Sequence, residues 1–383
     1  MVVGADRLVE RMRGFGTTIF AEMSALALQT GSINLGQGFP DTDGPAALLE
    51  AAQAAIRDGH NQYPPGPGIL ALRQAVAAHQ RRYYRLEFDP ETDVLVTAGA
   101  TEAIAASVLA LADAGDDVVV FEPYYDSYAA SIALAGAQRI PVTLRRDKQR
   151  WVFDEDEFRA AITPQTKAIL LNTPHNPTGK VFTAAELEVV ANTAREHDLI
   201  VIADEVYEHL TFDGRPHTPI ATLPDMADRT ITIGSAGKTF SVTGWKVGWA
   251  TGPRELITAV RTVKQFLTYV NGAPFQPAVA AALDVLDPEP LASALQDQRD
   301  RLCDGLEQTG FDVIRPQATY FATADVGTNA LTYCRELPHR AGVVAVPSSV
   351  FYDSHDGDTY VRFAFCKRPE VLDAAVARLK ELA

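Results

Sequence analysis

Short, strongly apolar runs alternate with amphipathic segments of helical length through the middle of this chain. A run at 94–97 precedes a helical pattern at 101–112, and a run at 168–172 precedes one at 184–196. Such alternation is typical of strand–helix–strand units, in which parallel strands form a sheet that helices cover on both faces. Further strands are expected at 118–121, 199–203, 230–233 and 247–251. The pattern predicts an α/β fold.

The C-terminal part of the chain has a different pattern. A long helical stretch at 288–310 precedes shorter apolar runs at 320–325, 343–347 and 360–365, and the chain closes with a helical pattern at 372–382. This order favours a second, smaller α+β domain. Two domains also agree with the length of 383 residues, which is more than one compact core usually holds.

The charge balance excludes some classes of partner. The chain has 34 basic and 49 acidic residues and a net charge of −15, whereas nucleic-acid binding needs a basic surface. Its three cysteines are widely spaced, which predicts neither a disulfide framework nor a metal site. No apolar run of membrane-spanning or signal-peptide length occurs. We therefore expect a cytoplasmic protein that binds no nucleic acid, membrane or metal.

A lysine among small residues follows the expected strand at 230–233. The stretch at 235–240 reads SAGKTF, with Lys238 in its middle. An amine that forms an imine must be uncharged when it attacks, and burial or neighbouring cations lower its pKa. Small neighbours would leave room for a flat cofactor. Taken alone, however, such a lysine is more often a surface residue in a turn.

Two side chains follow the strand expected at 199–203. Asp204 would lie at the carboxyl end of that strand, where α/β proteins bind ligands. A buried aspartate needs a cationic partner, and a protonated pyridine nitrogen could supply one. The alternative for Asp204 is a helix N-cap. Tyr207, three positions on, could bond the same ligand, although a half-buried structural tyrosine is the more common case.

Two further loops could bind a ligand. The loop at 173–179 reads TPHNPTG, whose prolines and glycine force an irregular backbone around Asn176. That amide could bond a ring oxygen and a substrate carboxylate, or simply belong to an Asn-Pro turn. The stretch at 97–103 reads TAGATEA and predicts a helix start with free amides, which could bind phosphate or form an ordinary turn.

Eight ordered motifs together resemble those of the class I/II aminotransferases of fold type I, which depend on pyridoxal 5′-phosphate. They are NLGQGFPD (34–41), NQYPPGPG (61–68), GATEAI (99–104), EPYYDSY (122–128), NTPHNPTGKVF (172–182), DEVYEHL (204–210), SAGKTFSVTGWKVGW (235–249) and YVRFAF (360–365). Within the family, the chain is most similar to the N-succinyldiaminopimelate branch and to the kynurenine/glutamine-type branch.

The resemblance implies a domain organisation. A large domain at 31–275 would contain a mostly parallel, seven-stranded sheet and bind the cofactor. A smaller α+β domain would occupy 276–383, and an N-terminal segment at 1–30 would pack with it. The family also forms homodimers whose active sites are shared between the subunits.

The resemblance also assigns cofactor contacts. Lys238 would form the Schiff base and move the proton, Asp204 would pair with the pyridine nitrogen, and Tyr207 would bond the phenolate oxygen. Asn176 would bond that same oxygen. The remaining cofactor contacts are Tyr125, which would stack on the ring, and the phosphate ligands Ala100, Thr101, Ser235, Lys246 and, from the second subunit, Tyr63. Many relatives have arginine where this chain has Lys246.

Substrate contacts follow from the same resemblance. Arg362 would bind the α-carboxylate, and its apolar neighbours in YVRFAF agree with a buried guanidinium that needs an anionic partner. Gly38 and Asn176 would also contact the carboxylate, and Phe20 would line the pocket. For a distal carboxylate we consider Arg13, Lys264, Tyr269 and Asn271. The resemblance further implies cis peptide bonds at Glu122–Pro123 and Asn176–Pro177.

The implied activity is transfer of an amino group from an amino acid to 2-oxoglutarate. The donor that the resemblance favours is N-succinyl-LL-2,6-diaminopimelate, which would place the enzyme in lysine biosynthesis. The alternative is a broad aminotransferase for glutamine, methionine, aromatic amino acids or kynurenine, with or without β-lyase activity on cysteine conjugates. Transcription regulators with an aminotransferase-like domain need a DNA-binding segment, and the residues before 30 are too few for one.

Overall fold

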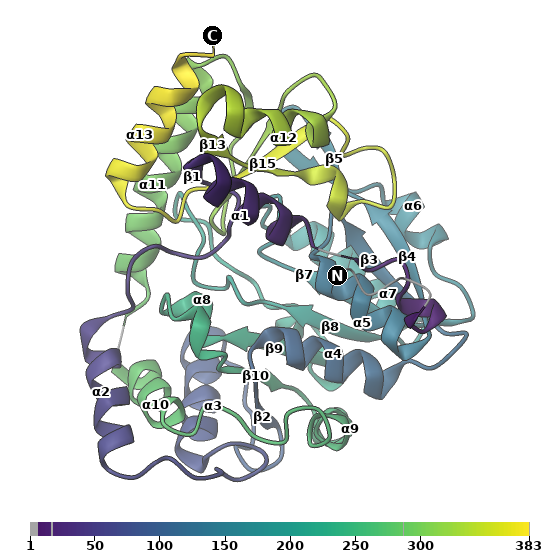
Figure 1. The fold of residues 1–383 in the computed structure, drawn as a ribbon. Coiled ribbons are helices and arrows are strands. Elements are labelled where there is room, and N and C mark those ends of the chain that lie inside the picture. Colours follow the sequence, from purple (N-terminus) through teal and green to yellow (C-terminus); the bar gives the residue numbers. More distant parts are fainter. Residues whose placement is uncertain (1–6, 17, 286, 383) are drawn as a thin grey trace.

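The structure is a computed structural model that describes residues 7–16, 18–285 and 287–382. Figure 1 shows a larger part built around a central sheet and a smaller part, formed mainly by the C-terminal third of the chain, above it. Residues 1–6 and 17 of the expected N-terminal segment, and residues 286 and 383, lie outside the described residues.

A seven-stranded sheet forms the centre of the larger part, in the order β2-β10-β9-β8-β7-β3-β4. Its neighbouring strands are parallel except where β10 runs antiparallel to β2 and β9. The expected mostly parallel, seven-stranded sheet is thus confirmed. Its strands are β2 (Val94–Thr97), β3 (Asp117–Glu122), β4 (Gln138–Thr143), β7 (Thr166–Asn172), β8 (Ile200–Asp204), β9 (Thr230–Ser235) and β10 (Gly248–Thr251).

Residues of the central strands alternate between two hydrophobic clusters. In β3, Val118 and Val120 belong to one cluster, whereas Val119 and Phe121 belong to the other. This alternation is the period of two that an extended strand imposes. Because helices cover both faces, both sets are apolar, so the strand reads as one continuous hydrophobic run.

Helices cover the two faces of this sheet (Figure 1). The first cluster contains α4 (Ala100–Leu111), α5 (Asp126–Ala135) and α9 (Arg254–Lys264), and the second contains α6 (Glu155–Ala160) and α7 (Ala184–Glu196). A third cluster packs α2 (Ala46–Arg57), α3 (Leu70–Tyr84) and α10 (Phe275–Val285) next to β2 and β10. Helix α7 has the bounds that the sequence predicts, and the capping box of Thr183 and Glu186 sets its start.

The smaller part is built on a four-stranded antiparallel sheet in the order β11-β12-β15-β14. Helix α11 packs against α13, and the N-terminal helix α1 packs against α12. Strand β1 pairs in parallel with β13. The elements are α1 (Ile19–Thr30), β1 (Ile33–Asn34), α11 (Glu289–Gln308), β11 (Asp312–Ile314), β12 (Phe321–Asp325), α12 (Ala330–Ala341), β13 (Val343–Val344), β14 (Val346–Pro347), β15 (Tyr360–Ala364) and α13 (Pro369–Lys380).

These contacts bear on the expected domain bounds. Helix α10 packs against α2 and α3 of the larger part, although the sequence analysis assigns residues from 276 onward to the small domain. A division between α10 and α11 therefore agrees better with the packing than one at 275. The pairing of β1 with β13 likewise attaches residues 33–34 to the smaller part.

Two further observations concern local features. The peptide bonds Glu122–Pro123 and Asn176–Pro177 are cis, which confirms the expectation, and Thr173–Pro174 is cis as well. Across the described residues, every helix is too short or too polar to cross a membrane.

Candidate active site

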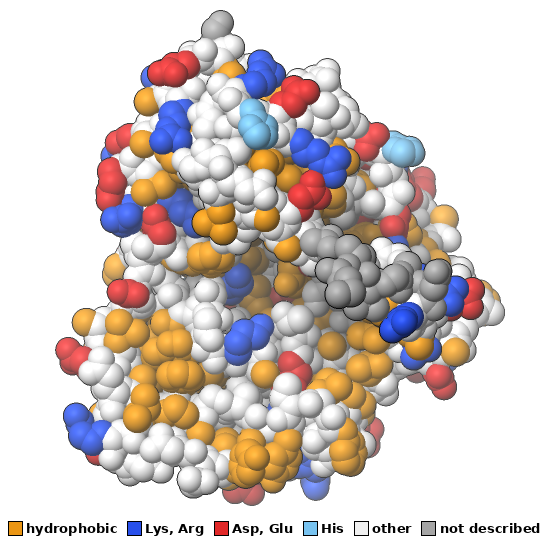
Figure 2. All heavy atoms as spheres, viewed as in Figure 1, with side chains coloured by type: hydrophobic (Ala, Val, Ile, Leu, Met, Phe, Trp, Pro, Cys, Tyr) orange, Lys and Arg blue, Asp and Glu red, His pale blue; other side chains and the backbone are white. Residues whose placement is uncertain are grey.

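A cavity lies where the larger and smaller parts meet, with about 1120 Å³ of empty space that is partly open to solvent. Figure 2 shows a hollow between the two parts with basic side chains inside it. The expected cofactor contacts that line the cavity are Ala100, Thr101, Tyr125, Asn176, Asp204, Tyr207, Ser235, Lys238 and Lys246. The expected substrate contacts Phe20, Gly38 and Arg362 line it too.

Lys238 projects from the turn that follows β9. The short helix α8 (Ala236–Thr239) begins as β9 ends, so the lysine lies at the carboxyl edge of the sheet. Its Nζ lies 5.5 Å from the ring centroid of Tyr207 and 5.2 Å from that of Tyr320. Burial lowers the pKa of Lys238 to about 8, so a far larger share of this amine is neutral near physiological pH than of an ordinary lysine.

Asp204 ends the neighbouring strand β8 and is buried. Burial raises its pKa to about 6, while hydrogen bonds from the Tyr128 hydroxyl and the Val206 amide oppose that shift. A turn, not a helix, follows Asp204, so the helix-cap alternative is wrong. A buried carboxylate at the cavity wall can pair with a cationic group of a ligand.

Arg362 reaches the cavity from β15 of the small sheet and is almost completely buried. Its Nη1 donates to Asn176 Oδ1 at 3.2 Å and its Nη2 to the Gly36 carbonyl at 3.1 Å. Its Nε is buried without a hydrogen-bond partner, and no carboxylate of the described residues forms a salt bridge with it. The guanidinium therefore has capacity left for an anion that enters the cavity.

Aromatic rings enclose this guanidinium. Its carbon lies 4.0 Å from the ring centroid of Phe321, 5.1 Å from that of Phe351 and 5.2 Å from that of Phe20. Burial lowers the pKa of Arg362 to about 10, which still leaves it charged at neutral pH. The rings exclude water and so strengthen its attraction for a carboxylate.

The opposite end of the cavity is built to hold an anion. Helix α4 begins at Ala100, directly after Gly99, whose φ is +76°. A Cβ at Gly99 would lie 3.2 Å from Lys246 Nζ, so the glycine lets this ammonium approach the helix N-terminus. Free amides of a helix start, a lysine and the Ser235 hydroxyl together favour a phosphate group.

Tyr63 does not line the cavity of this chain. Its side chain is 80% exposed, and its ring packs edge-on against Tyr269 with centroids 5.5 Å apart. The candidates for a distal carboxylate also lie outside the cavity lining. Lys264 donates to the carbonyls of Gly66 and Tyr269, Asn271 to those of Thr97 and Lys246, and Arg13 to that of Leu8.

Several residues of the cavity were missed by the sequence analysis. Tyr128, which bonds Asp204, lies in the quoted EPYYDSY motif three positions after Tyr125, so helical spacing was an available signal. Phe321 and Gln37 also line the cavity, and Tyr320 packs on Lys238. Gln37 lies in the quoted NLGQGFPD motif beside Gly38, so that motif was an available signal, whereas Tyr320 and Phe321 reach the site only through the placement of the small sheet.

Comparison with known proteins agrees with this geometry. The family model for aminotransferases of class I and II matches residues 30–379. The chain belongs to this aminotransferase family. It is therefore an enzyme that transfers amino groups, and its fold is that of the fold type I aminotransferases.

Individual relatives cover nearly the whole chain. A probable N-succinyldiaminopimelate aminotransferase from Mycobacterium tuberculosis is 53% identical, over 98% of both chains. The solved structure of the N-succinyldiaminopimelate aminotransferase from that organism superimposes with a TM-score of 0.96, covering 98% of this chain and all of the other. A methionine aminotransferase from Escherichia coli is 38% identical over 96% of both chains. A human kynurenine–oxoglutarate transaminase is 37% identical, over 97% of this chain and 89% of its own.

Proposed function

We propose that this aminotransferase uses pyridoxal 5′-phosphate, with Lys238 as the residue that carries it. The cavity has a site suited to each part of that molecule. The start of α4 with Lys246 and Ser235 suits its phosphate, and the buried Asp204 suits its protonated ring nitrogen. The partly neutral Lys238 amine suits its aldehyde. When bound, the cofactor supplies a sink for the electrons of the substrate Cα–H bond.

The protein residues would then bind, orient and move a proton. Arg362 and Asn176 hold the substrate α-carboxylate, which directs the Cα–H bond toward Lys238. The lysine amine accepts that proton and returns one during the second half of the reaction. Asp204 would keep the ring nitrogen protonated, Tyr207 would bond the ring oxygen and Tyr125 would pack on the ring.

For substrate, we propose N-succinyl-LL-2,6-diaminopimelate as amino donor and 2-oxoglutarate as acceptor, hence a step of lysine biosynthesis. The sequence identity of 53%, over 98% of both chains, to a probable N-succinyldiaminopimelate aminotransferase supports this more than any other observation. Relatives named for methionine and kynurenine are less similar, at 37–38% identity. The second candidate is thus a broad aminotransferase, with or without β-lyase activity.

A donor screen tests this substrate assignment. Each donor is supplied with 2-oxoglutarate, and glutamate formation is followed for the succinylated diaminopimelate, glutamine, methionine, phenylalanine and kynurenine. The succinylated donor should have the highest kcat/KM. A clear preference for kynurenine, methionine or glutamine, with little turnover of the succinylated substrate, would favour the broad alternative.

We also propose that the protein is a homodimer in which Tyr63 reaches the phosphate site of the other subunit. A phenol that is 80% exposed suits a partner outside this chain. Figure 2 shows hydrophobic side chains gathered on the lower part of the visible face. Large apolar side chains left exposed in the single chain include Leu28, Ile56, Phe266 and Tyr269. Exposed apolar side chains that lie together are typical of an interface, and Tyr269 packs beside Tyr63.

For location, we propose the cytoplasm. The three cysteines are free and buried, which suits a reducing compartment. Fractionation of cells that express the chain with a C-terminal epitope would test this.

A further inference from the structure

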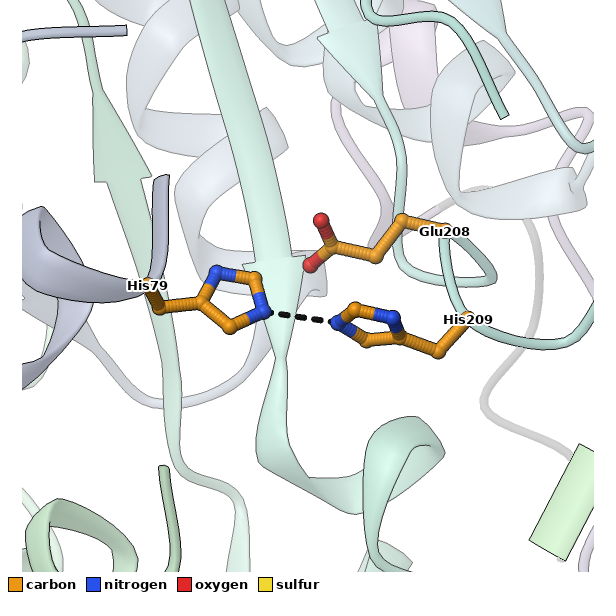
Figure 3. A group of neighbouring side chains, drawn as sticks. All are labelled: His79, Glu208 and His209. Carbon is orange, nitrogen blue, oxygen red and sulfur yellow. Dashed lines mark hydrogen bonds between the residues drawn. The ribbon is translucent and has the colours of Figure 1, made fainter. Parts of the chain in front are cut away.

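Three side chains of types that bind metal ions lie close together outside the active-site cavity. His79 comes from α3, whereas Glu208 and His209 come from the turn that begins with Asp204 at the end of β8. Figure 3 shows the two imidazole rings pointing toward one another, with the Glu208 carboxylate directed over the gap between them. The two Nε2 atoms are 2.7 Å apart, and the ligand atoms of all three residues lie within 4.8 Å of one another.

The short distance between the two histidine nitrogens requires a proton or a cation between them. Two imidazole lone pairs repel at 2.7 Å, so either a shared proton or a metal ion must lie there. A hydrogen bond of this length between the two rings requires at least one neutral imidazole. Neutral imidazole is the form that binds metal ions.

A neighbouring side chain is placed to set the tautomer of His79. Gln80 Nε2 lies 3.4 Å from His79 Nδ1, and Gln80 Oε1 is buried without a hydrogen-bond partner. Turning this amide over would let the oxygen accept a hydrogen bond from Nδ1–H, which satisfies the oxygen and leaves a lone pair on Nε2. Metal-binding histidines commonly donate their second nitrogen to an oxygen in this way.

The surroundings favour a cation. Two acidic neighbours act electrostatically on the cluster, Glu205 on Glu208 and Asp287 on His209. His217 and Arg82 act on His209 in the opposite direction, and the Arg82 guanidinium also donates to the carbonyls of Leu283 and Asp284. A narrow gap, too tight to hold a water, borders both histidines, and His209 is partly exposed to solvent.

We propose that His79, Glu208 and His209 bind a divalent transition-metal ion of the Zn²⁺ class. Two imidazole nitrogens and one carboxylate oxygen are a donor set that Zn²⁺ accepts, with a fourth position left for a further ligand such as water. Tetrahedral coordination with bonds near 2 Å separates the nitrogens by about 3.3 Å, so His209, the less buried ring, must shift slightly outward.

The ion would help to position the turn that follows β8 and would stabilise the folded protein. It would join α3 to the turn that carries Asp204 and Tyr207, and the same gap is bordered by Thr239 and Phe240, which follow Lys238. Because a ligand that binds only the folded state stabilises it, Zn²⁺ should raise the melting temperature. The site does not touch the reacting atoms, and it is independent of the substrate proposal. The expectation of no metal rests on the spacing of the three cysteines, whereas these two histidines are 130 positions apart in the chain.

The test is a titration of holoenzyme with zinc chloride alone, followed by calorimetry and by metal analysis after dialysis. Matched variants are His209→Gln, Glu208→Gln and, as control, His339→Gln, which replaces an exposed histidine of α12. Wild type and control should bind one ion per chain and gain thermal stability. The two site variants should lose affinity by at least about tenfold. Co²⁺ in wild type should give the intense visible bands of tetrahedral coordination.

Two outcomes would overturn the site. One is Zn²⁺ affinity in His209→Gln and Glu208→Gln equal to that of the wild type, which would mean that surface groups bind the ion. The other is no saturable uptake by the folded wild type, which would leave the histidine pair as a plain hydrogen bond. Both variants are first compared with the wild type by circular dichroism. If either fails to fold, the Co²⁺ spectrum of the wild type decides.

Discussion

The Tyr128 hydroxyl donates a hydrogen bond to the Asp204 carboxylate, with Oη and Oδ2 2.5 Å apart. Both side chains are buried, one from α5 and one from the end of β8. Burial raises the pKa of Asp204, and this bond opposes the rise by stabilising the charged form. Tyr128 thus helps to keep an anion at the cavity wall, where the proposed cofactor nitrogen would need one.

Replacing Tyr128 by Phe should weaken cofactor binding. Without the donor, the pKa of Asp204 rises further above 6, so more of the carboxyl is protonated and pairs poorly with a pyridinium. A hydrogen bond to a charged group contributes about 1.5–3 kcal/mol, so the Kd for pyridoxal phosphate should increase roughly ten- to hundredfold. Absorbance titration of apoenzyme measures this. Tyr124→Phe, which removes a bond to Asp353 instead, is the control; equal losses in both variants would contradict the role.

The pKa of Lys238 predicts how apoenzyme takes up the cofactor. Only the neutral amine attacks an aldehyde, and burial lowers this pKa to about 8. The rate of incorporation should therefore rise with pH up to about 8 and then level off. Stopped-flow absorbance follows the reaction.

Covalent labelling distinguishes the two cavity lysines. Borohydride should fix the cofactor on Lys238 in the wild type and in Lys246→Ala, which should bind it more weakly. Peptide mass spectrometry identifies the labelled residue. Label on Lys246, or label retained by Lys238→Ala, would refute the assignment.

Replacing Arg362 by Ala should impair both half-reactions. The guanidinium is buried, and removing a buried charged partner typically costs about 2–5 kcal/mol, so kcat/KM should fall by roughly thirtyfold to several-thousandfold. Donor and acceptor should be affected alike, because both present an α-carboxylate. Arg362→Lys should recover only part of the loss, since it lacks the planar fork. Arg146→Ala, which removes a surface ion pair with Asp312, should leave steady-state kinetics unchanged.

Shared active sites predict complementation between inactive subunits. Lys238→Ala should be inactive, and Tyr63→Ala should bind cofactor poorly. In a mixed dimer, one site combines the Lys238 of one subunit with the Tyr63 of the other. Random exchange should therefore restore activity at about a quarter of all sites. Mixtures no more active than their components, or sedimentation that shows an active monomer, would exclude the arrangement.

The sequence by itself determines the large sheet and one edge of the site. Strands buried on both faces must be continuous apolar runs, so six of the seven strands are visible in the pattern. The exception is β4, an edge strand with the mixed sequence QRIPVT and a partly exposed surface. Asp204, Asn176 and Lys238 each follow such a run, and parallel strands end at one edge, so their convergence is also predictable.

Only the tertiary structure decides what approaches that edge from elsewhere. Arg362 enters the cavity because the small antiparallel sheet packs above the large one. Tyr63 stays outside it, and His79 of α3 meets His209 of the turn after β8 although 130 positions separate them. Hydrophobic periodicity depends on residues a few positions apart, and it specifies each element locally. Which elements meet depends on the packing of whole surfaces against each other, and no local pattern contains that information.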